Sequence, residues 1–533
     1  MLGSGKVVYP VGVAAICRFS TLKRKPLPSI HETAKRKRCT VSENFLSGPL
    51  HAVASGTPVF QTEGKEKPEI VTSPYEGKTA IVVGAGPAGS VAGILLAKRG
   101  FNVKVIEKRS NPNKISVGEI HRSILLVINP EVTEYLLELG VDVATEPSDE
   151  GLTEFRKASR ISETGEIMPG YSGAGKRQFL AERHAVAESI LKTGFSKYLP
   201  NLKFIFDSKC EDVDVASRVV RFSNLDGKTS EFSYDLLIGA DGINSRVREA
   251  LQSAGHLKFS QRASKGRYVS IRNLPPPKEA PKELLDDIVV GNLVSGQLKQ
   301  VWNGPKYVFL YQTKNGLVQG SLGGRKGCFE AIRGRELRWI TKAAPDCFPK
   351  DYLEPFAGQL RKARPSPIGP VTYCSPYIGP NEALIGDACH SATPTLGIGA
   401  NRAILDARDL DVALGNSQGN LTEALKNYDE ECRPQVAAIQ ELEAVHPQAQ
   451  LEGQHPLLKI FIPFYTAFHS IGNRLFPNLI PQSAFAQLFN STAPPVEVMK
   501  SFKKSVALWG VVIGSFGALV ASVLLTALLK LLA

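Results

Sequence analysis

The sequence predicts an α/β protein: a Rossmann-like dinucleotide-binding domain, an antiparallel β domain, a helical C-terminal part and one C-terminal transmembrane helix. Three observations carry this prediction. A Gly-x-Gly-x-x-Gly motif lies between a strand pattern and a helix pattern near residue 84. Two later segments, 234–248 and 383–414, repeat the order of apolar strand and glycine-containing turn. Finally, residues 505–529 contain no charged residue.

The first nucleotide-binding element begins with Thr79–Val83, a short apolar and β-branched run typical of a buried parallel strand. The sequence Gly-Ala-Gly-Pro-Ala-Gly follows at once, and a helical pattern then runs to about Arg99. In this setting Gly84 permits the tight turn, Gly86 leaves room for a pyrophosphate, and Gly89 lets the helix approach the strand. The phosphates are expected at the positive N-terminal end of that helix.

A second predicted strand, Asn102–Ile106, ends at an acid, Glu107. Glu107 lies eighteen residues after Gly89, close to the roughly twenty expected for the acid that binds ribose hydroxyls. The glycine motif, both flanking elements and this acid together predict dinucleotide binding. They do not distinguish between dinucleotides.

The next two blocks repeat the pattern of a buried strand that runs into a turn. In Tyr234–Ser245, the strand Leu236–Ile238 precedes the turn at Asp241 and Gly242. In the block that begins at Ala383, a strand leads to Asp387 and then to a helix from Arg402 to about Leu414. A carboxylate at a strand end can accept hydrogen bonds from the hydroxyls of a polyol chain. Backbone N–H groups near the start of the helix are expected to face the ligand; they belong to Gly399, Ala400 and Asn401.

These three blocks, in this order, resemble the single-component flavin hydroxylases, the family of p-hydroxybenzoate hydroxylase, from about Gly77 to Arg433. The resemblance implies an FAD-binding Rossmann-like domain of the glutathione-reductase type. It also matches Arg183 to the family arginine that opens a helix and contacts FAD. The residues expected to bind FAD are Gly84, Gly86, Gly89, Glu107, Arg183, Asp241, Gly242, Asp387, Gly399, Ala400 and Asn401.

Within that family the chain is similar to the kynurenine 3-monooxygenases at two further places, Tyr373–Tyr377 and Phe461–Thr466. It departs from the family pattern at Ile398, where Gly-Gln-Gly is usual. The family often has an acid soon after the asparagine, and in this chain Asp406 holds a related but shifted place. The family's substrate arginine has no secure match. Arg122 is the nearest arginine, and we take Arg122 and Asn401 as the candidate substrate contacts.

The resemblance implies a monooxygenase that hydroxylates an aromatic or related small substrate. NADPH or NADH would reduce FAD, and oxygen would add to give a flavin hydroperoxide that transfers one oxygen atom to the ring. Residues from about Phe259 to Val371 are expected to supply the closed apolar pocket that such a species needs. No catalytic acid or base and no metal ligand is assigned, and a structural role is preferred for His390.

Alternative functions remain open at this stage. A reductase on the same FAD fold, or a hydroxylase of an isoprenoid or quinone lipid, would also suit a membrane-bound protein. A non-catalytic flavoprotein tether would fit Ile398 but not the intact acids at Glu107, Asp241 and Asp387. A halogenase is disfavoured because its tryptophan-rich motif is missing. Nucleic-acid binding is not expected, despite a net charge of +13, because no zinc-finger or RNA-binding signature is present.

The expected organisation has five parts. A basic leader covers 1–75, an FAD-binding domain 76–255 and 375–435, and a substrate-binding β-sheet domain 256–374. A helical, membrane-proximal region covers 436–504, and a transmembrane helix 505–529.

The two ends suggest a location. The first forty residues hold nine Lys or Arg and one acid, Glu32, as in an organellar transit peptide, although a nuclear signal at 35–38 is an alternative. Twenty-five uncharged residues at 505–529 are long enough to cross a bilayer. We therefore expect an organellar membrane protein with a single C-terminal anchor, mitochondrial rather than plastid.

Overall fold

The described residues of the computed structural model all lie within one compact unit, 70–533. The structure describes residues 73–111, 125–141, 153–162, 167–172, 178–197, 200–274, 291–312, 317–344, 348, 350–445, 469–476, 480, 482–490 and 493–532. The predicted leader, apart from its last three residues, and the candidate substrate residue Arg122 lie outside these ranges.

A five-stranded parallel sheet forms the centre of the nucleotide-binding part, in the order β19-β11-β1-β2-β7. Its strands are β1 (Thr79–Val83), β2 (Asn102–Ile106), β7 (Leu202–Ile205), β11 (Leu236–Gly239) and β19 (Glu382–Leu384). The bounds of β1 and β2 are those predicted from the sequence. The residues of β11 are all buried, as expected for a parallel strand covered on both faces.

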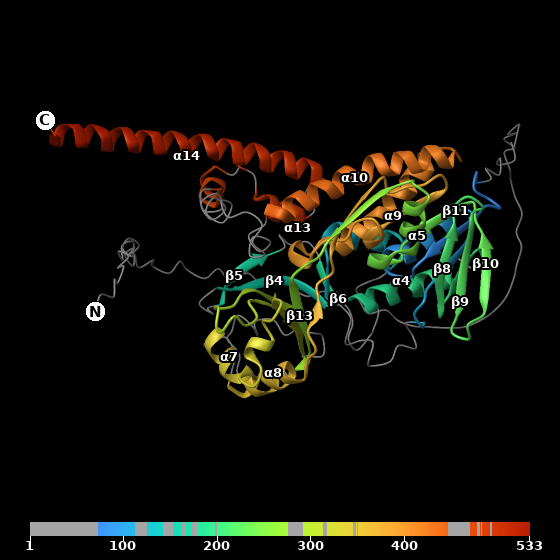
Figure 1. Ribbon diagram of the computed structural model, residues 1–533, viewed down its shortest axis with the longest axis horizontal. Helices are drawn as coiled ribbons and strands as arrows, with labels where there is room; N and C mark the ends of the chain where they lie inside the picture. Colours follow the sequence, from blue (N-terminus) through green and yellow to red (C-terminus); the bar gives the residue numbers. More distant parts are fainter. Residues whose placement is uncertain are drawn as a thin grey trace, which may run out of the picture. The chain divides into compact units, whose positions relative to one another are not determined.

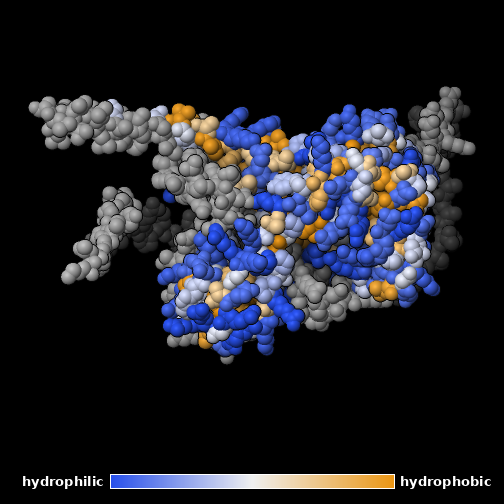
Figure 2. Space-filling model, viewed as in Figure 1, coloured by the Kyte–Doolittle hydropathy of each residue, from blue (hydrophilic) through white to orange (hydrophobic). Residues whose placement is uncertain are grey.

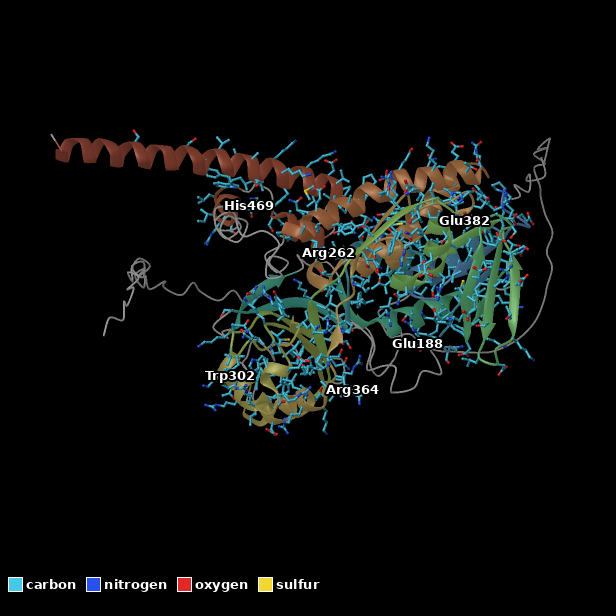
Figure 3. All side chains as sticks on the ribbon, viewed as in Figure 1. Glu188, Arg262, Trp302, Arg364, Glu382 and His469 are labelled. Carbon is cyan, nitrogen blue, oxygen red and sulfur yellow. The ribbon has the colours of Figure 1, made fainter. Side chains whose placement is uncertain are left out.

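Helices α1 (Pro87–Lys98), α9 (Gly399–Asn416) and α10 (Leu421–Val445) pack beside this sheet (Figure 1). The parallel sheet and these helices share one hydrophobic core. At the edge strand, the Tyr234 hydroxyl donates to the Glu382 carboxylate at 2.7 Å, and Glu382 is fully buried (Figure 3). The Tyr428 hydroxyl of α10 donates to the Leu384 carbonyl at 2.8 Å, so the same strand is also fixed to the helical layer.

Between β7 and β11 the chain forms an antiparallel ribbon of three strands, and a short helix follows β11 (Figure 1). The elements are β8 (Ser208–Asp214), β9 (Val219–Asn224), β10 (Thr229–Ser233) and α5 (Arg246–Ser253). Farther along, β12 (Lys258–Arg262) pairs with β18 (Val371–Ser375) in a two-stranded sheet. This pair lies where the chain leaves the nucleotide-binding part and where it returns.

The second large sheet has nine strands, and its neighbours run antiparallel except for the parallel pair β14–β4. The strand order is β17-β13-β16-β15-β14-β4-β6-β3, with β5 paired to β4. The strands are β3 (Leu125–Ile128), β4 (Thr153–Ile161), β5 (Ile167–Ser172), β6 (Gln178–Glu182), β13 (Gly266–Leu274), β14 (Gly291–Gln297), β15 (Tyr307–Gln312), β16 (Val318–Arg325) and β17 (Ser366–Pro367). The sheet therefore includes β3 to β6, a segment that the predicted division placed in the FAD-binding domain.

Helices α7 (Glu336–Ala343) and α8 (Lys350–Lys362) cover one face of this second sheet (Figure 1). Their apolar side chains form a second core with alternate residues of β13, β15 and β16. In this core the Phe356 ring of α8 is stacked with Phe348 and tilted relative to Tyr352. The outer surface of α7 and α8 is largely hydrophilic (Figure 2), as expected for amphipathic helices on a sheet.

The C-terminal part contains α13 (Ala484–Asn490) and the long helix α14 (Pro495–Leu532). Helix α14 begins ten residues before the predicted span, and its first turns carry Lys500, Lys503 and Lys504. A spanning helix needs about twenty consecutive apolar residues. Among the described residues, no helix combines the length and the apolar character required to cross a bilayer. The prediction of a transmembrane helix at 505–529 is therefore wrong, and membrane anchoring through it is not supported.

All five cysteines whose side chains are described are free and buried, namely Cys210, Cys328, Cys374, Cys389 and Cys432. Burial raises the pKa of the Cys210 and Cys374 thiols to about 12, so these groups stay protonated and unreactive at neutral pH.

The second core should make a large, local contribution to stability. Ile340 of α7 is fully buried there. Ile340→Ala removes most of its aliphatic side chain and leaves a cavity that the surrounding residues cannot fully fill. We expect a loss of about 2–5 kcal/mol in the free energy of unfolding, measured by denaturant titration. A loss below about 1 kcal/mol would show that this core can repack around the cavity.

Candidate functional site

The glycine-rich turn after β1 is formed by close backbone contacts. Gly84 has a φ of +105°, and a Cβ there would lie 2.4 Å from the Ala240 carbonyl oxygen. A Cβ at Gly89 would lie 2.0 Å from the Gly84 oxygen, so α1 touches the strand end. By contrast, no atom lies within 4 Å of a Cβ built on Gly86, the N-cap of α1. The turn therefore leaves open space only where a pyrophosphate would approach.

Glu107 stabilises this turn from the end of β2. Its Oε2 accepts the Ala85 N–H at 2.8 Å and its Oε1 accepts the Arg109 N–H at 3.0 Å. The side chain is largely buried. A carboxylate has about four acceptor positions, so two backbone bonds leave capacity for ligand hydroxyls.

Asp241 stands at the end of β11, beside the same turn. Its Oδ2 accepts the Arg246 N–H at 2.6 Å, and burial raises the pKa of the carboxyl group. Its Oδ1 is buried and has no hydrogen-bond partner among the described residues. A buried acceptor without a partner is costly in a native protein and indicates a missing donor.

Two further residues predicted to bind the cofactor are Asp387, in the third motif, and Arg183, at the start of a helix. Arg183 is the first residue of α4 (Arg183–Lys197) and is half-buried, and burial together with Arg109 lowers its pKa. Asp387, Tyr268 and Glu107 act on Arg183 in the opposite direction. The Asp387 side chain is accessible to solvent, yet the surrounding protein raises its pKa by desolvation, against the opposing effect of His390 and Arg183. Glu107 of the first motif and Asp387 of the third are therefore near enough to Arg183 to affect its pKa.

The N-terminus of α9 completes the site. Its N-cap, Ile398, makes no side-chain capping bond, and nothing lies within 4 Å of a Cβ built on Gly399. The N–H groups of Gly399 and Ala400 have no capping acceptor among the described side chains. Such a helix end favours an electron-rich ligand.

The Asn401 side chain forms hydrogen bonds with other groups of the protein. Its Oδ1 accepts the Asn129 N–H at 2.9 Å, and its Nδ2 donates to the Val127 carbonyl at 2.7 Å. The side chain is 2% exposed. Asn401 therefore joins α9 to the segment between β3 and α3 (Pro130–Glu138), and only its backbone is directed to the helix end.

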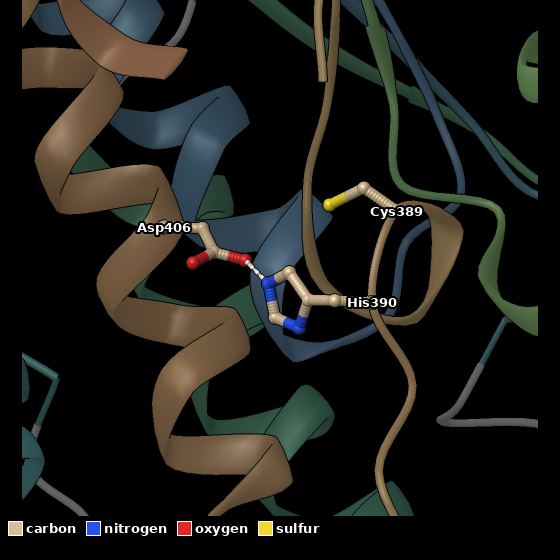
Figure 4. Close-up of side chains that lie close together, drawn as sticks. All are labelled: Cys389, His390 and Asp406. Atoms are coloured by element: carbon tan, nitrogen blue, oxygen red, sulfur yellow. Dashed lines mark hydrogen bonds and ion pairs between the residues drawn. The ribbon is translucent and has the colours of Figure 1, made fainter. Parts of the chain in front are cut away.

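Asp406 of α9 is fully buried beneath the Gly386–Asp387 turn (Figure 4). Its Oδ2 accepts the Gly386 N–H at 2.8 Å and lies 2.6 Å from His390 Nε2, while Arg402 Nε donates to Oδ1 at 2.8 Å. Burial alone would raise the pKa of Asp406, but His390 and Arg402 hold it below its usual range. His390 thus has the structural role that the sequence favoured.

Cys389, His390 and Asp406 lie close enough to suggest metal ligands, since their donor atoms are within 4.8 Å of one another. Each already has a protein partner. The Cys389 thiol donates to the Leu384 or Gly386 carbonyl, and Asp406 is paired as described. The hydrogen bonds therefore account for this cluster without a metal ion.

Two residues at the site were not identified from the sequence. The Arg248 guanidinium donates to the Ala388 and Ile243 carbonyls at 2.7 and 2.9 Å, so it joins the second and third motifs. Gln178, at the start of β6, is fully buried, and neither its Oε1 nor its Nε2 has a partner among the described residues.

These observations fit FAD. Gly86 leaves open space where a pyrophosphate would lie, Glu107 and Asp387 could accept hydrogen bonds from ribose and ribityl hydroxyls, and the α9 N-terminus would be directed to the ring system or its linker. Among the described residues, the Asp241 Oδ1 has no hydrogen-bond partner, and it is the polar atom here that a donor of a bound dinucleotide could satisfy.

Comparisons with known proteins agree with this geometry. The family model of the FAD binding domain matches residues 78–282 and 372–442, just over half of the chain. Violacein synthase of Chromobacterium violaceum is 25% identical over 452 residues, covering 81% of this chain and 98% of that protein. Kynurenine 3-monooxygenase of Phaeosphaeria nodorum is 25% identical over 378 residues, covering 68% and 76%.

Solved structures show the same fold. PqsL of Pseudomonas aeruginosa, in complex with 2-aminobenzoylacetate, has a TM-score of 0.54 at 20% identity and covers 72% of this chain and 99% of its own. The tetrameric form of 2-methyl-3-hydroxypyridine-5-carboxylic acid oxygenase has a TM-score of 0.51 at 18% identity and covers 71% and 93%. The chain therefore belongs to the FAD-binding-domain family, and it is an FAD-dependent monooxygenase that uses NAD(P)H as its reductant.

Proposed function

We propose that the protein hydroxylates a small aromatic substrate of the kynurenine type at the face of the second sheet that lies next to the FAD site. The observation that supports this most directly is the meeting of the cofactor motifs with an aromatic sheet face at Arg183. Relatives named kynurenine 3-monooxygenase, from fungi and bacteria, support the substrate class.

The strand register defines this sheet face. Val269, Val308 and Leu310 point into the core with α7 and α8. Their neighbours Tyr307 and Phe309 therefore point to the other face, because side chains alternate along a strand. Tyr268 lies on that face too, since Tyr268 and Tyr307 both pair with Gly323.

This face adjoins the cofactor site, since Tyr268 is among the groups that act electrostatically on Arg183. Tyr268, Tyr307 and Phe309 are all half-buried. FAD, when bound, supplies the oxygen-activating redox chemistry, and the protein supplies orientation and a dry environment. An aromatic sheet face beside Arg183 suits a planar ring and excludes water from it.

Substitutions at Gly86 and Gly89 should have different effects. The first should weaken FAD binding, and the second should lower the stability of the folded protein. Gly86→Ala adds a methyl group where the protein leaves space, so the apo-protein should keep its stability while FAD binds tenfold to a hundredfold more weakly, on the order of 1–3 kcal/mol. Gly89→Ala forces a contact with the Gly84 oxygen and should lower the apo-protein's unfolding free energy by about 1–3 kcal/mol. Flavin-fluorescence titration and thermal unfolding measure the two effects. Unchanged FAD affinity in Gly86→Ala would contradict the placement of the pyrophosphate.

FAD affinity should depend on pH through Asp387 and Asp241. Burial raises the pKa of both carboxyls, whereas hydroxyl donors of FAD would favour their ionised forms. FAD should therefore bind more tightly above these raised pKa values and lose affinity as pH falls through them, starting above the ordinary carboxyl pKa of about 3.9. Asp387→Asn should weaken binding about tenfold at neutral pH and make the pH dependence shallower, measured by titrations across pH. If the Asp387→Asn variant binds FAD with the wild-type pH profile, the Asp387 carboxylate does not contact FAD.

Substrate identity is tested with the full-length, FAD-loaded protein. NADPH or NADH oxidation and oxygen uptake are followed with and without L-kynurenine, and products are identified by mass spectrometry. Kynurenine should accelerate both rates in step and gain one oxygen atom. FAD-loaded protein that does not respond to kynurenine, but does respond to another aromatic compound, would overturn only the kynurenine assignment. Reduction of a lipid or quinone without oxygen uptake would overturn the hydroxylase proposal itself.

A further inference from the structure

Ile398 occupies a position that local helix chemistry does not explain. It is the N-cap of α9, with φ −105° and ψ −9°, and it makes no side-chain capping bond. Isoleucine is among the poorest N-cap residues, because it has no oxygen to accept the first helical N–H groups. The first N–H groups of α9 are thus left for a ligand. Helix capping does not account for an isoleucine at this position, so we consider how its side chain packs in the tertiary structure.

The Ile398 side chain is only 7% exposed and packs into a small core, here called the C-terminal core. Three helices contribute to it, each from a different part of the C-terminal region. The other buried members are Ala438, Ile439 and Leu442 of α10, Ala484 and Leu488 of α13, and Val498 and Met499 of α14. The turn that begins α9 is therefore part of the same apolar cluster as the first turns of α14.

Helix α10 also fixes the loop that precedes this turn. Glu443 accepts the Thr393 N–H at 2.8 Å and also the Thr393 hydroxyl. Gln440 donates to the Thr372 carbonyl at 2.9 Å, and Thr372 is in turn bonded to Ser391. The loop from Ser391 to Ile398 is thus attached to α10 by polar contacts at one end and apolar contacts at the other.

Polar contacts fix α14 relative to α10 and to the neighbouring segment. The Val496 N–H donates to Gln435 of α10 at 3.2 Å, and Lys503 pairs with Glu441 at 2.8 Å. His469, labelled in Figure 3, lies 3.1 Å from the Ser505 hydroxyl of α14. These contacts make the start of α14 a part of the folded body.

We infer that Ile398 is a positioning residue, through which α10, α13 and α14 set the place of the α9 N-terminus at the FAD site. Close-packed cores transmit displacements because they have little free volume. A loosened C-terminal core would let the Gly399 and Ala400 N–H groups move relative to Asp387. FAD would bind more weakly, and substrate-induced NAD(P)H oxidation would yield less product because water would enter the site. This inference depends on FAD binding and not on the identity of the substrate.

The test compares Ile398→Ala and Val498→Ala with Ile340→Ala, which removes the same or a similar apolar side chain from the core under α7. In the full-length protein, FAD affinity is measured by fluorescence titration, and amide hydrogen exchange of residues 386–403 is measured without FAD. We expect Ile398→Ala and Val498→Ala to weaken FAD binding on the order of tenfold and to speed exchange in that segment. Ile340→Ala should lower thermal stability but leave both quantities unchanged.

Two further variants keep the inference testable if Ile398→Ala does not fold. Ile398→Val loses one methylene group and should stay within about tenfold of the wild-type affinity, between wild type and Ile398→Ala. The double variant Ile398→Val/Val498→Ala should weaken binding by less than the product of the single effects, since both residues act through one cluster. If Ile398→Val and Val498→Ala lower only thermal stability, as Ile340→Ala does, the C-terminal core has no positioning role.

Discussion

The buried carboxylate of Asp406 is the interaction on which the FAD site depends. It binds the Gly386 N–H of the turn that carries Asp387, and it also binds His390 and Arg402. A buried charge is tolerated only when it is paired and hydrogen-bonded, and Asp406 satisfies both conditions. One side chain therefore fixes the third cofactor motif to α9, the helix whose N-terminus completes the site.

The two sheets contribute different groups to the site. The parallel sheet supplies fixed strand ends, so that Glu107, Asp241 and Asp387 stand at one edge of one sheet. The second sheet supplies an aromatic face rather than a set of charged groups. This arrangement suits an enzyme in which the cofactor does the chemistry and the protein controls position and access to water.

The differences between prediction and structure have physical causes. An uncharged C-terminal stretch predicted a membrane span, but no described helix meets that requirement, and α14 begins at Pro495 as a packed part of the body. The Asn401 side chain was expected at the ligand, yet it is consumed by Asn129 and Val127. Asn401 shows that a local pattern does not include the neighbours that the tertiary structure brings to it, and its contact with substrate stays a prediction.

The sequence by itself determined the nucleotide-binding elements. Strands β1 and β2, the glycine turn and the acids at strand ends follow rules that operate over fewer than thirty residues, because backbone geometry and strand burial are local properties. Only the tertiary structure decided which distant groups meet: Arg183 with Asp387 and Tyr268, Arg248 with Ala388, and Ile398 with α14. Such contacts depend on how whole layers pack, and no local pattern in the chain encodes that packing.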